Sequence, residues 1–199
     1  RPMRARPIEP WPVCAWPLHA PTGTPCVVVV VALPLPHDLP RAQARQRVRE
    51  VAQTLIAQRL GCQPADVTLQ ALPGQAPCVA GSTIGVSFAH EPGYSLVAIH
   101  EDGAVGVDVV RCTLPPDWEP VARDYLAPAT LAHLARLDDS RRRAAFARAW
   151  SAREATLKLH GQPLREWCEA DAQLRADCHP LALPPGWVGT LALPAPVPA

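Results

Sequence analysis

Lysine is almost absent from this sequence. Of its 19 lysine and arginine residues, Lys158 is the only lysine. Arginine therefore serves wherever the chain needs a generic positive charge, and the single lysine indicates a position that needs a compact ammonium rather than a planar guanidinium. The alternative is chance, because a composition rich in arginine can leave its one lysine anywhere. The residues around Lys158 have to decide between these two interpretations.

The sequence also lacks any marked excess of basic over acidic side chains, or of acidic over basic ones, in either half. The balance is even along the chain, with eight basic and seven acidic side chains in residues 1–105 and eleven of each in residues 106–199. Aromatic residues make up only 5% of the sequence. A nucleic-acid-binding module usually carries a basic stripe. A nucleic-acid or purely structural module is therefore disfavoured, and no nucleic acid partner is expected.

Long hydrophobic runs and paired cysteines are missing as well. The longest apolar run covers residues 26–33 and ends at Pro34, far short of the roughly 20 residues that a membrane-spanning helix needs. The run is typical of a buried strand. No signal peptide is visible, and none of the seven cysteines forms a C-x-x-C pair. Free thiols in a reducing cytoplasm are the simplest interpretation, and no membrane attachment is expected.

Proline, by contrast, is abundant. Most of the 25 prolines lie in residues 2–40, 115–128 and 180–198, which predicts irregular or extended segments there. A composition rich in arginine, alanine and proline is typical of a GC-rich bacterial genome.

The first half of the chain predicts one long helix and several strands. Over residues 40–60, apolar residues recur with spacings of three and four and form one face of a helix, namely Val48, Val51, Ala52, Leu55, Ile56 and Leu60. Asp38 is its candidate N-cap and Gly61 its stop. A short strand is expected over residues 66–72. Strands over residues 84–89, 94–100 and 105–111 are expected to form one small meander.

The second half repeats this order. Residues 115–120 are expected to be a connector. Helices are predicted over residues 128–137 and 140–160, the second capped by Asp139 or Ser140 and ended by Gly161. Strands are predicted over residues 173–176 and 187–193. The sequence thus predicts an α+β fold of two similar lobes, residues 1–104 and 105–199, each a small, mostly antiparallel sheet packed with a long helix.

Asp108 is the first candidate functional residue. It lies in the run Gly106-Val107-Asp108-Val109-Val110, where alternate side chains share a face, so Val107 and Val109 point to one side and Asp108 to the other. An aspartate buried in a run of valines is costly without a partner. It is either a metal ligand or an aspartate at an exposed strand end.

Trp150, Glu154 and Lys158 are the second candidate group, because positions one turn apart lie on the same face of a helix. Glu followed by Lys at i+4 is also a common surface pair, worth only a few tenths of a kcal/mol. The tryptophan one turn earlier implies that this face is partly buried. A third candidate, His90, ends a strand beside a loop, where a phosphate could approach, although a lone histidine is usually structural.

The order and spacing of these residues resemble those of the 4′-phosphopantetheinyl transferase superfamily, in the longer two-lobed form that activates peptide and polyketide synthetases. Its members carry a serine-histidine hairpin, a G-[IV]-D-[IV]-E strand and a helix of the form F-x-x-x-W-[ST]-x-[KR]-E-A-x-x-K-x-x-G. This chain has His90, then residues 106–109, then Phe146 to Gly161. The resemblance covers about residues 41–165, including residues 122–126 and 131–137, which are similar to the helix before the last motif.

The resemblance implies an activity and a role for each residue. The family moves the phosphopantetheine arm of coenzyme A onto a serine of an apo carrier protein and releases 3′,5′-adenosine bisphosphate. The active site would lie between the lobes. Asp108 and Glu154 would bind Mg²⁺, whose preferred ligands are carboxylate oxygens. Lys158 would hold a pyrophosphate oxygen, and His90 would donate to a phosphate. Glu154, or a water on the metal, would take the serine proton.

Four positions depart from the family pattern. Val110 replaces the second strand carboxylate, so water or a phosphate oxygen would have to fill that coordination position. Arg153 replaces the usual lysine before Glu154. Ala89 replaces the serine before His90, and Gln75 replaces the lysine of the G-K-P loop. Arg41 and Arg45 are therefore candidates for binding the 3′-phosphate of coenzyme A, with a solvated helix face as the alternative.

The resemblance also suggests partners and an alternative function. The carrier is an acyl, polyketide or peptidyl carrier protein whose helices are acidic, and Arg141, Arg142 and Arg143 are candidates for contacting it unless they are simply solvated. A monomer is expected, because both lobes are in one chain. The alternative is a non-catalytic protein of the same fold that binds coenzyme A or a carrier, suggested by Val110, Ala89 and Gln75.

Overall fold

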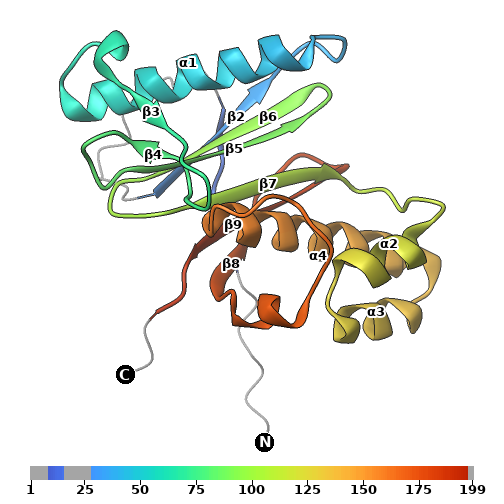
Figure 1. The fold of residues 1–199 in the computed structure, drawn as a ribbon. Coiled ribbons are helices and arrows are strands. Elements are labelled where there is room, and N and C mark those ends of the chain that lie inside the picture. Colours follow the sequence, from blue (N-terminus) through green and yellow to red (C-terminus); the bar gives the residue numbers. More distant parts are fainter. Residues whose placement is uncertain (1–8, 16–27, 197–199) are drawn as a thin grey trace, which may run out of the picture.

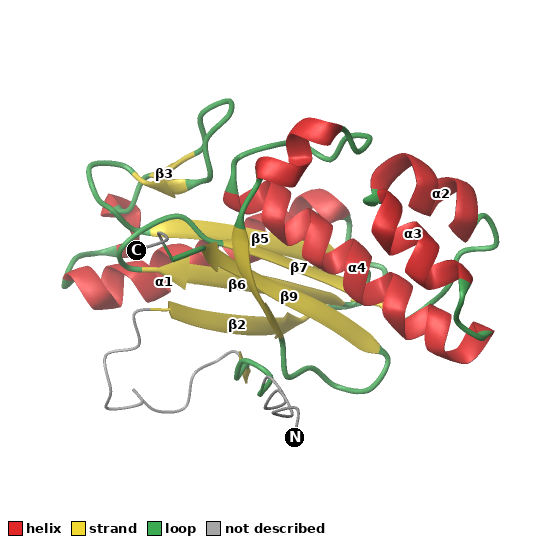
Figure 2. Cartoon of the chain, turned by 90° about the horizontal axis from the view of Figure 1, so that it is seen from below, coloured by secondary structure: helices red, strands yellow, loops and turns green. Residues whose placement is uncertain are grey.

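Four layers build the fold, in the order helix, sheet, sheet, helix (Figure 1). The structure is a computed structural model that describes residues 9–15 and 28–196. Helix α1 (Arg41–Leu60) covers a six-stranded sheet, and helix α4 (Asp139–Leu159) covers a three-stranded sheet. Figure 2 shows the other two helices, α2 (Trp118–Tyr125) and α3 (Pro128–Ala135), beside one end of α4 and away from the strands. The predicted α+β class is confirmed.

The six-stranded sheet has the order β1-β2-β6-β5-β4-β3. Its centre consists of the antiparallel strands β2 (Val28–Pro34), β6 (Tyr94–His100) and β5 (Gly85–Glu91). The predicted buried strand and hairpin are thus confirmed, while Cys26 lies outside the described residues. The short strands β3 (Leu69–Gln70), β4 (Cys78–Val79) and β1 (Cys14–Ala15) complete the sheet. The strand expected over residues 66–72 is shorter than predicted, because Pro64–Asp66 form a 3-10 turn.

The three-stranded sheet has the order β7-β9-β8, with β7 at Gly106–Arg111, β9 at Trp187–Pro194 and β8 at Ala176–Pro180. The predicted meander is therefore wrong in its third strand, because β7 pairs with β9 and not with β6. β7 instead packs face to face on the first sheet, where Val107 N donates a hydrogen bond of 3.0 Å to Ser87 Oγ. The turn after β6 carries the chain from one layer to the next.

Helix α1 buries the face that the sequence predicted. Residues with three- and four-residue spacing point toward the first sheet, and they include Val48, Val51, Ala52, Leu55 and Ile56. Leu60 was expected on this face but is 51% exposed. Gly61 ends the helix with a φ of 66°. The prediction of Asp38 as N-cap is wrong, because Pro40 occupies that position and the helix starts at Arg41.

The helices of the second half start at positions that differ from the prediction. The expected connector is helical from Trp118, since Pro120 lies in the first turn of α2, where a missing N–H costs nothing. Asp138, rather than Asp139 or Ser140, caps α4 and accepts a hydrogen bond of 3.0 Å from Arg141 N. Residues 169–173 form a 3-10 helix instead of starting a strand, and β8 begins only at Ala176.

The two sheets share one apolar core. Alternate residues of β2 and β6 point away from α1 and meet β7 and β9, namely Val30, Ala32, Leu96, Ala98, Val107, Val109 and Leu191. On the other side of the second sheet, Ala155 and Leu159 of α4 pack against Ala192. The expected boundary between residues 104 and 105 falls in the segment that joins the sheets. The division into two lobes stays a prediction.

Two further expectations concern the cysteines and the helices that could span a membrane. Within the described residues the cysteines are free thiols, at positions Cys14, Cys62, Cys78, Cys112, Cys168 and Cys178. The described helices include none with the length and apolar character that crossing a bilayer requires.

Gly106 sets the distance between β7 and α4. A Cβ at this position would lie 1.9 Å from Ala155 O and 2.8 Å from Leu159 N, which is backbone that cannot move aside. We expect Gly106→Ala to lower the free energy of unfolding by about 3 kcal/mol, as in overpacked cores. The measurement is the urea midpoint. Gly103→Ala is the control, because its Cβ meets only the His100 ring at 3.6 Å. Equal midpoints for the two variants would contradict this account of the packing.

Candidate functional site

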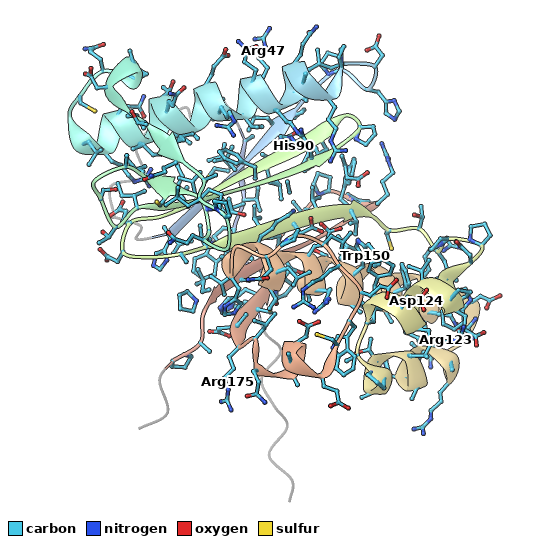
Figure 3. The ribbon with its side chains drawn as sticks, in the orientation of Figure 1. Arg47, His90, Arg123, Asp124, Trp150 and Arg175 are labelled. Atoms are coloured by element: carbon cyan, nitrogen blue, oxygen red, sulfur yellow. The ribbon has the colours of Figure 1, made fainter. Side chains whose placement is uncertain are left out.

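Every site residue predicted from the sequence lines one pocket of about 320 Å³ between the two halves of the chain. Its walls come from α1, β5, β7 and α4, with the residues Arg41, Arg45, Phe88, His90, Glu91, Asp108, Val109, Val110, Trp150, Glu154 and Lys158. Figure 3 shows His90 on the hairpin of the first sheet and Trp150 on α4, on opposite sides of β7. The pocket therefore brings together residues that are up to 117 positions apart in sequence, as from Arg41 to Lys158.

Asp108 and Lys158 form the central ion pair. Asp108 is only 4% exposed. Its Oδ1 lies 2.6 Å from Lys158 Nζ, which also donates to Val107 O at 3.1 Å. Burial raises the pKa of Asp108 to about 7, against the opposing effect of the Lys158 charge. Its other oxygen, Oδ2, is buried and has no hydrogen-bond partner among the described residues. Such an atom is costly unless a ligand satisfies it.

Glu154 is held one turn from Lys158. Trp150 Nε1 donates a hydrogen bond of 2.8 Å to Glu154 Oε1, and Oε2 lies 3.8 Å from Lys158 Nζ. Trp150 itself is fixed by stacking on Phe146 and by a tilted contact with Tyr125. The predicted helix face is therefore confirmed as a partly buried group. The main partner of Lys158 is Asp108 on β7 rather than its neighbour on the helix.

His90 faces the pocket as a neutral side chain. Its Nδ1 lies 3.2 Å from Ser95 Oγ, which is buried. Burial, together with the charges of Arg45, Lys158 and Arg41, lowers the pKa of His90 to about 4. When the Ser95 hydroxyl donates to Nδ1, the ring proton is on Nε2, which leaves a neutral donor for an anion.

The exposed guanidinium groups of Arg41 and Arg45 lie at the outer wall of the pocket, on the first turn of α1 and the next. Their effect on His90 indicates that their charges reach into the site. The Arg141–Arg143 run lies elsewhere, at the start of α4. Arg142 is bound there, with Nε donating to Leu134 O at 3.0 Å and the guanidinium 4.7 Å from the Trp118 ring. Arg142 thus holds the α3–α4 corner together.

Glu91 lines the pocket but was not predicted to do so from the sequence. It lies in the gap between the predicted strands over residues 84–89 and 94–100, but β5 continues through Glu91, which pairs with Tyr94. Burial raises the pKa of Glu91, Arg111 lowers it and the nearby carboxylate of Glu154 raises it. A signal was present, because Ser87, Ala89 and Glu91 alternate along one side of the strand.

The four departures from the family pattern lie in different surroundings. Val110 is half-buried at the pocket wall. Ala89 is 1% exposed and packs in the core between the sheets. Gln75 packs against Gly161 just after α4, where a Cβ on the glycine would lie 2.2 Å from the Gln75 carbonyl carbon. Of these positions, only Val110 lines the pocket.

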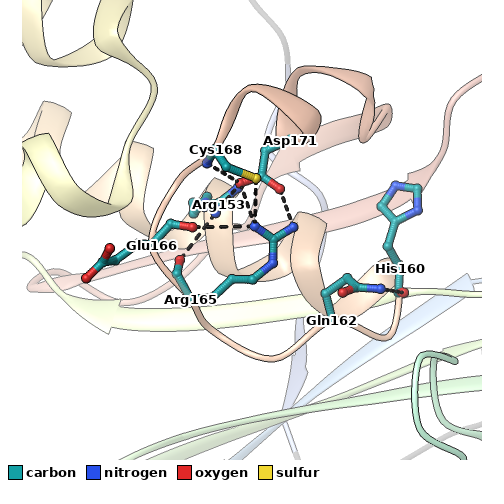
Figure 4. A network of polar contacts seen from close by, with 7 residues as sticks. All are labelled: Arg153, His160, Gln162, Arg165, Glu166, Cys168 and Asp171. Carbon is teal, nitrogen blue, oxygen red and sulfur yellow. Dashed lines mark hydrogen bonds and ion pairs between the residues drawn. The ribbon is translucent and has the colours of Figure 1, made fainter.

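Arg153 belongs to a buried network behind the pocket (Figure 4). Its Nη2 lies 2.8 Å from Asp171 Oδ2, and Arg165 binds the same carboxylate, whose side chain is fully buried. Cys168 N also donates to Asp171 Oδ2, at 3.0 Å. The network fastens the segment that follows α4 onto the helix, on the turn that carries Glu154.

The donor set of the pocket suits a small hard cation. Among the described residues, no three histidine, cysteine or carboxylate side chains already converge on one point. The buried, unpartnered Oδ2 of Asp108 and the half-buried carboxylate of Glu154 are nevertheless oxygen donors of the kind that Mg²⁺ prefers. The residues present therefore fit a magnesium ion that keeps several of its waters.

Comparisons with known proteins point to the same superfamily as the sequence motifs. Residues 104–188 match the sequence model of the 4′-phosphopantetheinyl transferase superfamily. The chain is also 25% identical over 154 residues to a Synechocystis sp. protein named "Putative 4′-phosphopantetheinyl transferase", and the match covers 71% of this chain and 63% of that protein. The chain thus spans less than two thirds of the length of this relative. Both findings confirm the resemblance to the superfamily.

The Arg153–Asp171–Arg165 network should stabilise the fold. We expect Asp171→Ala to lower the free energy of unfolding by about 3 kcal/mol, because it leaves a buried guanidinium without its partner. Urea denaturation measures the change. Asp177→Ala is the matched control, since its carboxylate pairs with His179 at a 52% exposed position. A loss no larger than that of the control would show that the network is not required.

The low pKa of His90 predicts a pH dependence of stability. The unfolded chain binds a proton at this histidine below its ordinary pKa of 6.5, whereas the folded protein does so only near 4. Between these values acidification therefore favours unfolding. Going from pH 7.5 to 5, the wild type should lose more stability than His90→Gln, as measured by urea midpoints. Parallel losses in the two proteins would contradict the assignment of a neutral, half-buried His90.

Proposed function

We propose that this chain, which matches the 4′-phosphopantetheinyl transferase superfamily, transfers the phosphopantetheine arm of coenzyme A to a serine of an apo carrier protein. The observation that carries the proposal is the meeting of Asp108, Glu154 and Lys158 in one pocket with a cationic rim. This arrangement combines oxygen donors for a hard cation with donors for phosphate oxygens. Phosphoryl-type transfer depends chiefly on positioning and charge neutralisation.

Asp108 and Glu154 are the residues that would bind magnesium. Asp108 offers its unpartnered Oδ2, and Glu154 is held in place by Trp150. When bound, the ion would supply positive charge beside the pyrophosphate of coenzyme A.

The basic residues bind the anionic substrate. Lys158 has three N–H donors, and the hydrogen bonds to Asp108 and Val107 use two of them. The third is available for a pyrophosphate oxygen. His90 donates to a phosphate without adding charge. Arg41 and Arg45 hold the 3′-phosphate, because they carry positive charge at the outer wall of the pocket.

The transfer forms one bond and breaks one. The serine oxygen of the carrier attacks the phosphorus that bears the pantetheine arm. A new oxygen–phosphorus bond forms while the pyrophosphate bridge breaks, and 3′,5′-adenosine bisphosphate leaves with the bridging oxygen. Glu154 takes the serine proton, since its carboxylate is partly exposed, at 23%, and fixed by Trp150. Lys158 stabilises the charge on the oxygens of the pyrophosphate.

The carrier is an acyl, polyketide or peptidyl carrier protein. The proposed test mixes the protein with coenzyme A, Mg²⁺ and each class of apo carrier, and weighs the carriers by mass spectrometry. A gain of one phosphopantetheine arm supports transfer. Binding of coenzyme A without a mass gain on any of the carriers would favour the alternative of a non-catalytic coenzyme A-binding protein.

Removal of either metal-binding carboxylate should abolish transfer. We expect Asp108→Ala and Glu154→Ala to lower the rate by roughly 100-fold or more, because charge on the pyrophosphate is then poorly neutralised. The rate of carrier modification is the measurement, and circular dichroism confirms that the variants fold. Glu119→Ala is the control, since this carboxylate is exposed on α2. Near wild-type rates for either pocket variant would refute the metal assignment.

Lys158→Arg should also slow the transfer. The ammonium satisfies acceptors on Asp108 and Val107 from a single nitrogen, and a planar fork spreads its donors over three nitrogens. We expect a drop of roughly tenfold or more in turnover, as for a lost transition-state donor. Unchanged turnover would mean that any cation suffices at this position.

A further inference from the structure

Val110 leaves the site with one carboxylate fewer than the family pattern. The strand that carries Asp108 has an aliphatic side chain at the wall of the pocket, where the pattern G-[IV]-D-[IV]-E has a glutamate. Of the carboxylates in the family motifs, only those of Asp108 and Glu154 then remain. Another negatively charged residue that faces the same pocket could compensate for this loss.

We propose that Glu91, at the end of β5, supplies the third carboxylate of the cation site. This inference rests on the proposed function, because it concerns the same pocket. Glu91 comes from the opposite sheet and lines the pocket together with Asp108, Glu154 and Val110. The carboxylate that the second sheet lacks is thus provided across the interface by the first.

The pairing of strands directs Glu91 to this place. Side chains alternate along a strand, so Ser87, Ala89 and Glu91 share one side of β5. Ser87 Oγ accepts a hydrogen bond from Val107 N, which shows that this side faces β7. Arg111 Nη2 donates to Pro92 O at 3.3 Å and holds the hairpin tip against the end of β7. Glu91 therefore lies where β7 carries Val110.

The surroundings of Glu91 favour a role beyond a surface charge. Its side chain is half-buried, and burying a carboxylate without a partner is unfavourable. The charge of Arg111 lowers the pKa of Glu91, but among the described residues the two side chains form no ion pair, and the Arg111 guanidinium lies 4.3 Å from the Trp187 ring centroid. Glu154 contributes a like charge to its environment. Carboxylates gathered in this way are stabilised when a cation joins them.

The unpartnered oxygen of Asp108 independently indicates a ligand. Asp108 Oδ2 is buried in the pocket wall and lacks a hydrogen bond from any described residue. Magnesium keeps several of its waters and binds one or two carboxylates directly. A third carboxylate can therefore hold the ion through its waters, which agrees with the absence of three converging donors among the described residues.

Metal binding by the protein alone tests this inference. Mn²⁺, which replaces Mg²⁺ in oxygen sites and has a paramagnetic signal, is titrated into wild type and Glu91→Gln while electron paramagnetic resonance counts the free ion. We expect Glu91→Gln to bind Mn²⁺ about tenfold more weakly, an effect typical of losing a residue that holds the metal's own ligands in place. The double variant Glu91→Gln with Val110→Glu should regain affinity, because it returns the carboxylate to the strand.

Glu101→Gln is the matched control. Glu101 lies at the other end of the hairpin, beyond the last residue of β6, and pairs with Arg59 at 2.6 Å. The Glu101→Gln variant should bind Mn²⁺ with the same affinity as the wild type, and urea midpoints should show that all variants are folded. Equal Mn²⁺ affinity of Glu91→Gln and wild type would overturn the inference.

The outcome separates this inference from the proposed function. A protein that modifies a carrier and binds Mn²⁺ without help from Glu91 would support the function and refute the role of Glu91. A protein that modifies no carrier but loses Mn²⁺ affinity in Glu91→Gln would refute the function and retain the cation site.

Discussion

The ion pair between Asp108 and Lys158 is the interaction on which the site depends. Asp108 lies in a strand of valines and is nearly fully buried, a position that is costly for a carboxylate without a cation. Lys158 reaches it because α4 rests directly on the backbone of β7 at Gly106, where Ala155 O leaves no room for a Cβ. Backbone packing therefore determines where the charges meet. Both residues of the ion pair come from the second half of the chain, Asp108 from β7 and Lys158 from α4, which covers the second sheet.

The pocket mixes charges of both signs, and each half of the chain provides both. The first half contributes Arg41, Arg45 and Glu91, and the second contributes Asp108, Glu154 and Lys158. Two unit charges about 4 Å apart interact by about 4 kcal/mol at an effective dielectric constant of 20. A cation and a pyrophosphate that enter together would each meet charges of opposite sign. The pocket is thus suited to binding a cation and a pyrophosphate together. It forms only when the two sheets are packed on each other.

The sequence predicted those parts of the fold and the site that depend on local periodicity. The apolar face of α1 and the shared face of Trp150, Glu154 and Lys158 follow from helical spacing. The sheet to which β7 belongs could not be predicted, because its partner β9 is some eighty residues away and strand pattern does not specify a partner. Glu91 was missed for a related reason. A Glu-Pro-Gly sequence indicates a turn, and Pro92 and Gly93 do form one, but pairing with Tyr94 extends the strand as far as Glu91.

The single lysine can now be explained by geometry. An ordinary surface pair would have Glu154 as its closest partner, yet that contact is 3.8 Å while the contact to Asp108 is 2.6 Å. Lys158 Nζ also meets Val107 O, so that acceptors from a side chain and a backbone converge on one nitrogen. Three N–H groups on one atom match this arrangement and leave one donor directed elsewhere. A guanidinium distributes its donors over a plane and suits two parallel acceptors better than several that converge on a point. The geometry of the pocket therefore favours lysine over arginine at this position, however rare lysine is elsewhere in the chain.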